Sequence, residues 1–171
     1  SVVVNGEIYN FQELRAELES KGHRFKSRSD SEVCLHLYEE EGVDFLERLR
    51  GMYALALWDA PRRRLVLARD RFGKKPLFYH AGADGLVFAS ELAALVASNC
   101  VERRPDLDAI DSFLCLQYVP SPSTAFEGVR KLPAGSRLVC ENGKLGEPER
   151  YFELRFDQTR SDSFRDLTVE L

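Results

Sequence analysis

The chain has 171 residues, 44% of them hydrophobic and 30% charged, which is typical of one soluble globular domain with a sizeable core. The net charge of −4 argues against a nucleic-acid-binding surface, and no apolar stretch approaches the roughly 20 residues that cross a bilayer. We therefore predict neither nucleic acid nor a membrane as a partner.

The first elements in chain order are a strand and a helix. The β-branched run at residues 2–4 predicts a strand. Asn10 is placed to cap a helix that runs to about Lys21, with Glu13 completing a capping-box-like arrangement and Gly22 as the stop.

The next segment predicts a short strand and a second helix. The strand is expected at residues 23–26. The helix begins at Ser29 or Asp30 and ends at Gly42, and residues 43–50 predict a short helical turn.

After residue 50 the apolar residues recur with period two, which indicates strands. Four strands are predicted, at residues 51–60, 64–70, 76–81 and 86–90, and an antiparallel meander is the simplest arrangement. Helices follow at residues 91–98 and 106–118, and a hairpin at residues 135–146 turns at Asn142-Gly143. This order of helices, strands and helices indicates the α+β class.

The cysteines do not have the spacing of a metal or redox motif, because no CxxC pair occurs. We interpret them as small buried side chains in a reducing, cytoplasmic compartment. The histidines are scattered and no cluster of ligands accompanies them, so we predict no metal site, although distant residues can converge in space. The residues concerned are Cys34, Cys100, Cys115, Cys140, His23, His36 and His80.

The segment Asn5-Gly6-Glu7 interrupts the strand-like start and has two interpretations. It is either a tight Asn-Gly turn with a solvated Glu7, or a ligand site. As a site, the Asn5 amide and the Gly6 backbone N–H are two donors that can stabilise an oxyanion formed in acyl transfer. Glu7 can then hold the ammonium group of an amino-acid substrate.

Asp30 also has two interpretations. Its carboxylate can cap a helix N-terminus, where free N–H groups and the helix dipole favour negative charge. It can equally meet an ammonium group at the rim of a pocket, and the two roles do not exclude each other.

Two further features have a functional and a structural interpretation. The charged run at residues 69–76, with residues 62–64 nearby, lacks a phosphate-cradling motif, so we interpret it as a solvated hairpin rim or a subunit contact. Ser1 has the form of a terminal nucleophile activated by its own amine. A trimmed terminus is the interpretation we prefer for it.

Five segments occur in a fixed order: VVVNGEIYNFQELRAEL, SRSDSEV, FLERLRGMYALALWD, LARDRFGKKPLFY and FASELAAL. Together they resemble the glutaminase domain of glutamine-hydrolysing asparagine synthetases. That domain is a class II glutamine amidotransferase with the N-terminal-nucleophile hydrolase fold. The later stretch YVPSPSTAFEGVRKLPAGSRLV, with ERYFEL, resembles the asparagine synthetase branch in particular, and the resemblance covers roughly residues 2–156.

The resemblance assigns roles to the residues singled out above. It implies that Asn5 and Gly6 form the oxyanion hole for glutamine hydrolysis, and that Glu7 and Asp30 hold the ammonium group of the glutamine. On this basis the Asn-Gly segment is a site.

The resemblance also implies parts that have no counterpart here. The family's nucleophile is a cysteine at the mature N-terminus, and an upstream arginine pairs with the glutamine carboxylate. Cys34, the nearest cysteine, lies in a predicted helix and has no free α-amine. We therefore expect residues 1–156 to be a partial glutaminase domain without a cofactor, inactive alone. Residues 157–171 would be a linker and the start of a synthetase domain, which would use ATP and Mg.

The implied fold is a four-layer αββα sandwich of antiparallel sheets, incomplete at the N-terminus. Exposed sheet edges favour pairing with another chain, so we expect self-association, with a homodimer as one form, or marginal stability. The alternative function is a non-catalytic scaffold, as in the related β-lactam synthetases, which have lost the glutaminase cysteine. The presence of Asn5-Gly6-Glu7 and Asp30 argues against that alternative.

Overall fold

The computed structural model describes residues 1–83 and 85–156, so the predicted linker at residues 157–171 lies outside the described residues. The helical elements are α1 (Phe11–Ser20), α2 (Val33–Glu41), α3 (Leu92–Ala97), α4 (Leu107–Leu116) and the short 3-10 helices η1 (Asp30–Glu32) and η2 (Gly42–Arg48). The strands are β1 (Val2–Ile8), β2 (Gly51–Asp59), β3 (Arg64–Arg69), β4 (Phe78–Gly82), β5 (Gly85–Ala89), β6 (Val129–Lys131), β7 (Ser136–Glu141), β8 (Lys144–Leu145) and β9 (Glu149–Arg150).

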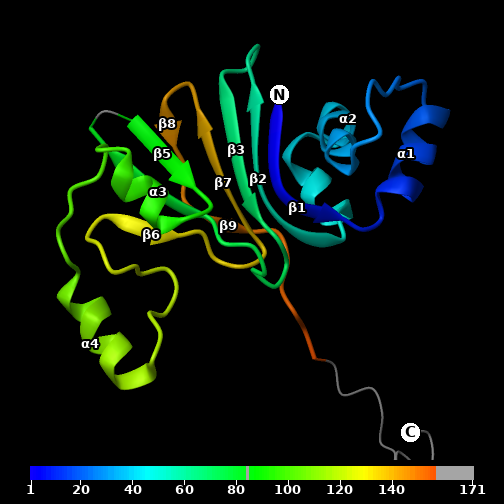
Figure 1. The fold of residues 1–171 in the computed structure, drawn as a ribbon. Coiled ribbons are helices and arrows are strands. Elements are labelled where there is room, and N and C mark those ends of the chain that lie inside the picture. The colour runs from blue at the N-terminus through cyan, green and yellow to red at the C-terminus, as the bar shows by residue number, and fades with distance from the viewer. Residues whose placement is uncertain (84, 157–171) are drawn as a thin grey trace, which may run out of the picture.

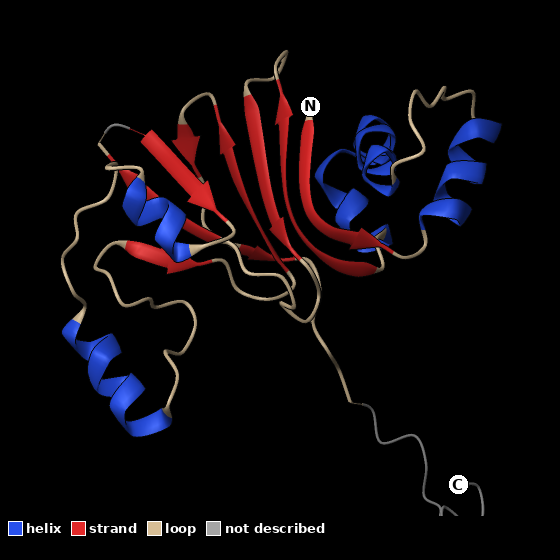
Figure 2. Cartoon of the chain, in the orientation of Figure 1, coloured by secondary structure: helices blue, strands red, loops and turns tan. Residues whose placement is uncertain are grey.

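The strands form two antiparallel sheets (Figures 1 and 2). Among the described residues, the large sheet has the order β1-β2-β3-β7-β8, with β9 also paired to β7, and the small sheet has the order β5-β4-β6. The predicted α+β class with antiparallel pairing is confirmed.

Alternate side chains of β2 enter two different cores. Tyr53 and Leu55 pack with α1 and α2, whereas Ala54 packs with Leu77 and the small sheet. A third cluster joins α3, through Leu95, to the opposite face of the small sheet. In Figure 1, α1 and α2 accordingly lie on one side of the large sheet, and the small sheet with α3 lies on the other.

The start of α1 is capped differently from the prediction. Asn10 precedes the helix, but its side chain makes no capping hydrogen bond, so the predicted capping box is wrong. Instead, Asn10 Nδ2 donates to the carbonyl of Arg48 (3.0 Å), and Asn10 Oδ1 accepts from the backbone N–H of Arg50 (2.9 Å). This residue therefore ties the end of β1 to the segment that enters β2.

The predicted strand at residues 23–26 is wrong. The Glu32 carboxylate accepts the backbone N–H groups of Lys26 and Ser27 at 2.7 Å, so a side chain takes the place of a neighbouring strand. The helix predicted next is confirmed, except that it opens with η1 before α2 begins. It ends at Gly42, which has a φ of +61°.

The four strands predicted after residue 50 and the later hairpin are confirmed as β2 to β5 and β7-β8. The meander is wrong, because β3 belongs to the large sheet and β4 to the small sheet. The short strands β6 and β9 had not been predicted. Both are too short to show an alternating pattern, and the partner of β6, the strand β4, lies far away in the chain.

The charged run at residues 69–76 crosses between the sheets and is not a solvated hairpin rim. Its Asp70 side chain is buried and accepts four backbone N–H groups at 3.0–3.2 Å. The Arg69 guanidinium donates to three backbone carbonyls at 2.7–2.9 Å. These two side chains fix the crossing by binding its backbone groups.

A tyrosine pair attaches the end of the described chain to the large sheet. The Tyr151 hydroxyl donates to the carbonyl of Arg69 (2.7 Å), so the Tyr53 hydroxyl donates in turn to the Tyr151 oxygen (2.9 Å). Burial raises the pKa of both hydroxyls, so both stay protonated at neutral pH.

Helix α4 stands away from both sheets (Figure 1). Backbone hydrogen bonds between residues 104–106 and 125–127 join the two ends of the segment that contains α4. Large apolar side chains are exposed on and after α4: Leu107, Ile110, Phe113, Leu114, Leu116 and Tyr118. Across the described part of the chain, the helices are too short or too polar to span a membrane.

Candidate functional site

Asn5, Gly6 and Glu7 lie inside β1, so the tight-turn interpretation is wrong. They pair with Ala54, Tyr53 and Met52 of β2 without a break in register. The polar residues are therefore presented from a continuous strand, and a strand is a more rigid support than a loop.

The side chains on the two faces of β1 lie in different environments. Val2, Val4 and Ile8 pack into the core under α1 and α2. Because side chains alternate along a strand, Asn5 and Glu7 point to the opposite face, where both are exposed. This is the face on which the small sheet lies.

Gly6 allows an unusually close approach of β1 to β2. Its φ is +148°, and a Cβ there would lie 1.9 Å from the Met52 carbonyl oxygen and 2.7 Å from the Tyr53 Cα. Any other residue would have to push the two strands apart. The sequence suggested glycine for access to a ligand, whereas the structure also requires it for strand pairing.

The Gly6 N–H group points away from β2. Tyr9 donates its N–H to the Arg50 carbonyl, toward the β2 side of the strand. Because N–H groups alternate between the two edges of a strand, those of Gly6 and Ile8 point to the other edge. Within the described residues, β1 is the last strand of its sheet at that edge.

Asp30 occupies this same edge. Its Oδ2 accepts the Ile8 N–H at 2.7 Å, two residues along the strand from Gly6. The prediction that Asp30 caps the helix is wrong, because Ser29 is the N-cap of η1 and accepts the Ser31 N–H at 3.3 Å. The fold thus brings Asp30 beside the Asn5-Gly6-Glu7 segment, and its half-buried carboxylate faces the strand.

A cavity of about 190 Å³ lies between the two sheets next to Asn5. Apart from Asn5, its lining residues had not been identified from the sequence: Val3, Ala54, Leu55, Ala56, Leu77, Phe88, Ala89 and Ser90. The period of two in β2 indicates that Ala54 and Ala56 share a face, but only the fold shows which strand faces them. Small side chains at these positions leave the space beside the Asn5 amide.

Cys34 is buried in α2, as the sequence predicted. Burial, and to a smaller extent the charge of Asp30, raise the pKa of its thiol to about 12. Since the thiolate is the nucleophilic form, Cys34 is inert at neutral pH. The prediction that all four cysteines are buried is wrong, because Cys100 and Cys115 are exposed.

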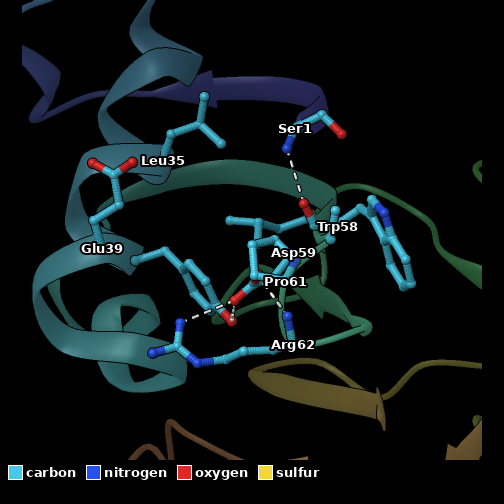
Figure 3. Close-up of a pocket in the computed structure, with 10 residues that line it drawn as sticks. Ser1, Leu35, Glu39, Trp58, Asp59, Pro61 and Arg62 are labelled. Atoms are coloured by element: carbon cyan, nitrogen blue, oxygen red, sulfur yellow. Dashed lines mark hydrogen bonds and ion pairs between the residues drawn. The ribbon is translucent and has the colours of Figure 1, made fainter. Parts of the chain in front are cut away.

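A larger pocket of about 420 Å³ lies at the other end of β1, beside Ser1 (Figure 3). The Ser1 amine donates to the Trp58 carbonyl at 2.9 Å, and Arg62 pairs with Asp59 at 3.0 Å. Ser1 is four residues before Asn5, roughly 13 Å along an extended strand. The pocket is therefore separate from the site formed by Asn5, Gly6, Glu7 and Asp30.

Comparison with known proteins gives one family. Residues 1–152 match the family described as "Glutamine amidotransferase domain". The chain is 38% identical over 162 residues to asparagine synthetase [glutamine-hydrolyzing] 1 of Bacillus subtilis, and the match covers 94% of this chain. It is 35% identical over 172 residues to asparagine synthetase [glutamine-hydrolyzing] 3 of the same organism, covering 100% of this chain. It spans about a quarter of the length of these relatives, 25% and 28%.

A solved structure has the same fold. The glutamine phosphoribosylpyrophosphate amidotransferase of Bacillus subtilis, complexed with ADP and GMP, superposes with a TM-score of 0.64 at 22% sequence identity. The match covers 88% of this chain and 29% of that one.

Proposed function

The chain belongs to the glutamine amidotransferase family, and from this premise we propose that its β1 edge is the glutamine-binding half of a glutaminase site. The parent protein would hydrolyse glutamine to glutamate and ammonia. A synthetase domain outside this chain would use the ammonia, with ATP and Mg, to amidate aspartate. The curated relatives, named as glutamine-hydrolysing asparagine synthetases, support this assignment.

The observation that carries the proposal is the hydrogen bond from Ile8 N–H to Asp30. It holds a carboxylate at the edge of β1 to which the Gly6 N–H points. Glu7 adds a second carboxylate from the neighbouring strand position. A negative charge at the edge of β1 and another on its exposed face favour an ammonium group, which is the charged amino end of glutamine.

The oxyanion donors follow from the same strand. The Asn5 amide and the Gly6 N–H are adjacent in sequence, and the backbone of Gly6 is fixed by its close approach to β2. Donors that are held in place before the reaction stabilise the developing charge without a reorganisation cost. Asn5 and Gly6 would therefore bind the oxygen of the tetrahedral intermediate.

We propose that this chain alone does not hydrolyse glutamine. The reaction needs a thiolate with a base beside it. Cys34, the cysteine closest in sequence to the site, is buried with a raised pKa and has no free α-amine. In the full protein an N-terminal cysteine would take this role, on upstream strands that would complete a four-layer αββα sandwich.

The experiment that tests the proposal is the intact mass and N-terminal sequence of the protein as its native cell produces it. A longer chain whose processed first residue is cysteine is the expected result. A mature chain without a terminal cysteine would overturn the hydrolase proposal. The domain would then be a non-catalytic scaffold, as in the β-lactam synthetases.

A further inference from the structure

Two histidines that are distant in the sequence converge beside α2. His23 lies in the connection after α1, and His36 lies in α2, with their Nδ1 atoms 3.2 Å apart. Glu39 follows three residues after His36 and places its Oε2 atom 3.1 Å from His36 Nδ1 and 3.5 Å from His23 Nδ1. No local pattern in the sequence connects these residues, because the histidines are thirteen positions apart.

When both imidazoles are neutral, hydrogen bonds alone do not satisfy every contact in this cluster. A neutral imidazole has one donor nitrogen and one acceptor nitrogen, and a carboxylate oxygen only accepts. If one Nδ1 atom donates a proton to the other, the accepting nitrogen has no proton to offer the Glu39 oxygen. The lone pairs of these two atoms then face each other. A cation at the centre can accept all three lone pairs at once.

The spacing of the three atoms fits one cation. Zinc binds histidine nitrogen and carboxylate oxygen at about 2.0–2.2 Å in a tetrahedron, which places neighbouring ligand atoms roughly 3.3–3.6 Å apart. The observed separations are 3.2, 3.1 and 3.5 Å. We propose that His23, His36 and Glu39 form a zinc site that joins the α1–α2 connection to α2.

The groups around the cluster support coordination through Nδ1. This mode leaves the proton on Nε2 of each ring. His23 Nε2 lies 2.9 Å from Glu40 Oε1, which fixes that tautomer. His36 Nε2 is buried without a hydrogen-bond partner in the described residues, and the closest carboxylate is Glu32 Oε1 at 3.8 Å. Carboxylates beyond the ligands orient histidine ligands in this way at known metal sites.

The ligand atoms favour zinc, which is intermediate between hard and soft metal ions, over hard ions such as magnesium and calcium. Two imidazole nitrogens suit zinc, whereas magnesium and calcium prefer oxygen ligands. The histidine side chains are 15% exposed and that of Glu39 is 61% exposed, so the fourth position opens to solvent and takes a water molecule.

The site has a structural consequence for the segment that follows. The metal would bind the α1–α2 connection at His23. Further along this connection, Glu32 accepts the N–H groups of Lys26 and Ser27. The connection then enters η1, which begins at Asp30. Zinc that binds only the folded form stabilises it by mass action. The metal would therefore fix the segment that precedes Asp30, and this role does not depend on glutamine hydrolysis.

The test is a calorimetric titration of the chain with zinc chloride. Both exposed cysteines are first replaced by serine (C100S and C115S), so that thiols do not compete for zinc. The chain with these two substitutions, which is the parent in this titration, should bind one zinc per molecule. The variants His36→Asn and Glu39→Gln should bind it more than about 100-fold more weakly, and Glu40→Gln about 10–100-fold more weakly.

A matched control is His80→Asn, because this histidine lies in the small sheet and its Nδ1 contacts the Gly128 carbonyl. It should bind zinc as the parent does. Cobalt in place of zinc should give the visible bands of a tetrahedral site, which Glu39→Gln should lose. Zinc should also raise the melting temperature of the parent and of the His80→Asn control.

Two outcomes would overturn the proposal. One is a parent that binds no zinc at micromolar concentrations. The other is equal affinity in the parent and in Glu39→Gln, which would place the metal elsewhere. Glu39 is mostly exposed, so its substitution leaves the fold intact and decides the question even if His36→Asn fails to fold.

Discussion

Gly6 meets two constraints at once. Its φ of +148° is disfavoured for residues with a Cβ, and a Cβ would collide with the β2 backbone. Gly85 has a similar φ of +128° but nothing within 4 Å of its Cβ position. The two glycines therefore separate the effect of strain from the effect of the collision.

We predict that Gly6→Ala lowers the free energy of unfolding by about 3 kcal/mol or more, and Gly85→Ala by only about 1 kcal/mol. Urea denaturation of both variants measures the difference. Equal losses would show that the backbone angle, and not the approach of β1 to β2, is what matters at Gly6.

Glu32 makes stability depend on pH. Hydrogen bonds from the Lys26 N–H and the Ser27 hydroxyl lower its pKa from 4.5 to about 2 in the folded protein. A carboxyl group with a lowered folded pKa contributes stability above its unfolded pKa and loses it as the pH falls. The contribution should be complete above about pH 4.5 and lost between there and about pH 2.

We predict that Glu32→Gln is destabilised by about 1–2 kcal/mol at neutral pH, because glutamine replaces a charged acceptor with a neutral one. The difference from the parent should shrink as the pH falls through this window. Denaturation at a series of pH values measures it. A difference that stays constant down to pH 2.5 or so would contradict the linkage.

At the scale of elements, the crossing from β3 to β4 depends on Asp70. Its two oxygens accept four backbone N–H groups, so an amide at this position would turn one acceptor into a donor. We predict that Asp70→Asn lowers the free energy of unfolding by roughly 3 kcal/mol.

The control for this substitution is Asp106→Asn. Asp106 is the N-cap of α4 and accepts the Ala109 N–H at 3.0 Å. Asparagine caps a helix about as well as aspartate, so this variant should be nearly neutral. Thermal denaturation of the two variants compares them, and similar losses would contradict the role given to Asp70.

The strands after residue 50 could be predicted because their apolar residues alternate, which is a local property of the sequence. The error at residues 23–26 and the missed crossing at residues 69–76 have a common cause. In both, a carboxylate binds backbone N–H groups that a neighbouring strand or a hairpin would otherwise satisfy. Residue patterns do not show which backbone a side chain will reach.

The candidate site was predictable in its chemistry but not in its geometry. Residue types suggested that Asn5 and Gly6 are donors and that Glu7 and Asp30 are charge partners, and the resemblance gave all four a role in binding glutamine. The bond from Ile8 to Asp30 joins residues 22 positions apart and needed the fold. The same holds for the convergence of His23 and His36.

At the scale of the whole molecule, two features favour association with a second copy. In the described residues, β1 is at one edge of the large sheet, and α4 carries exposed apolar side chains. Both a free edge and an apolar patch are typical sites of self-association. These features agree with the expected self-association, which stays a prediction.

We predict that the chain sediments as a dimer or larger species at micromolar concentration, and that Leu114→Glu shifts it toward the monomer. Leu114 is 71% exposed on α4. The control is Leu154→Glu, at a leucine that is 53% exposed outside α4, which should not shift it. A parent chain that sediments only as a monomer would contradict the prediction.

The central claim is that the β1 edge serves glutamine hydrolysis, and kcat of the full parent protein carrying Asn5→Ala tests it most directly. Loss of one oxyanion donor should lower kcat for glutamate release by about 100–1000-fold with little change in KM. Asn99→Gly, at an exposed asparagine with a φ of +60°, should keep the parent's kcat. If Asn5→Ala also kept the parent's kcat, Asn5 would not be an oxyanion donor, and the site assigned here would be contradicted.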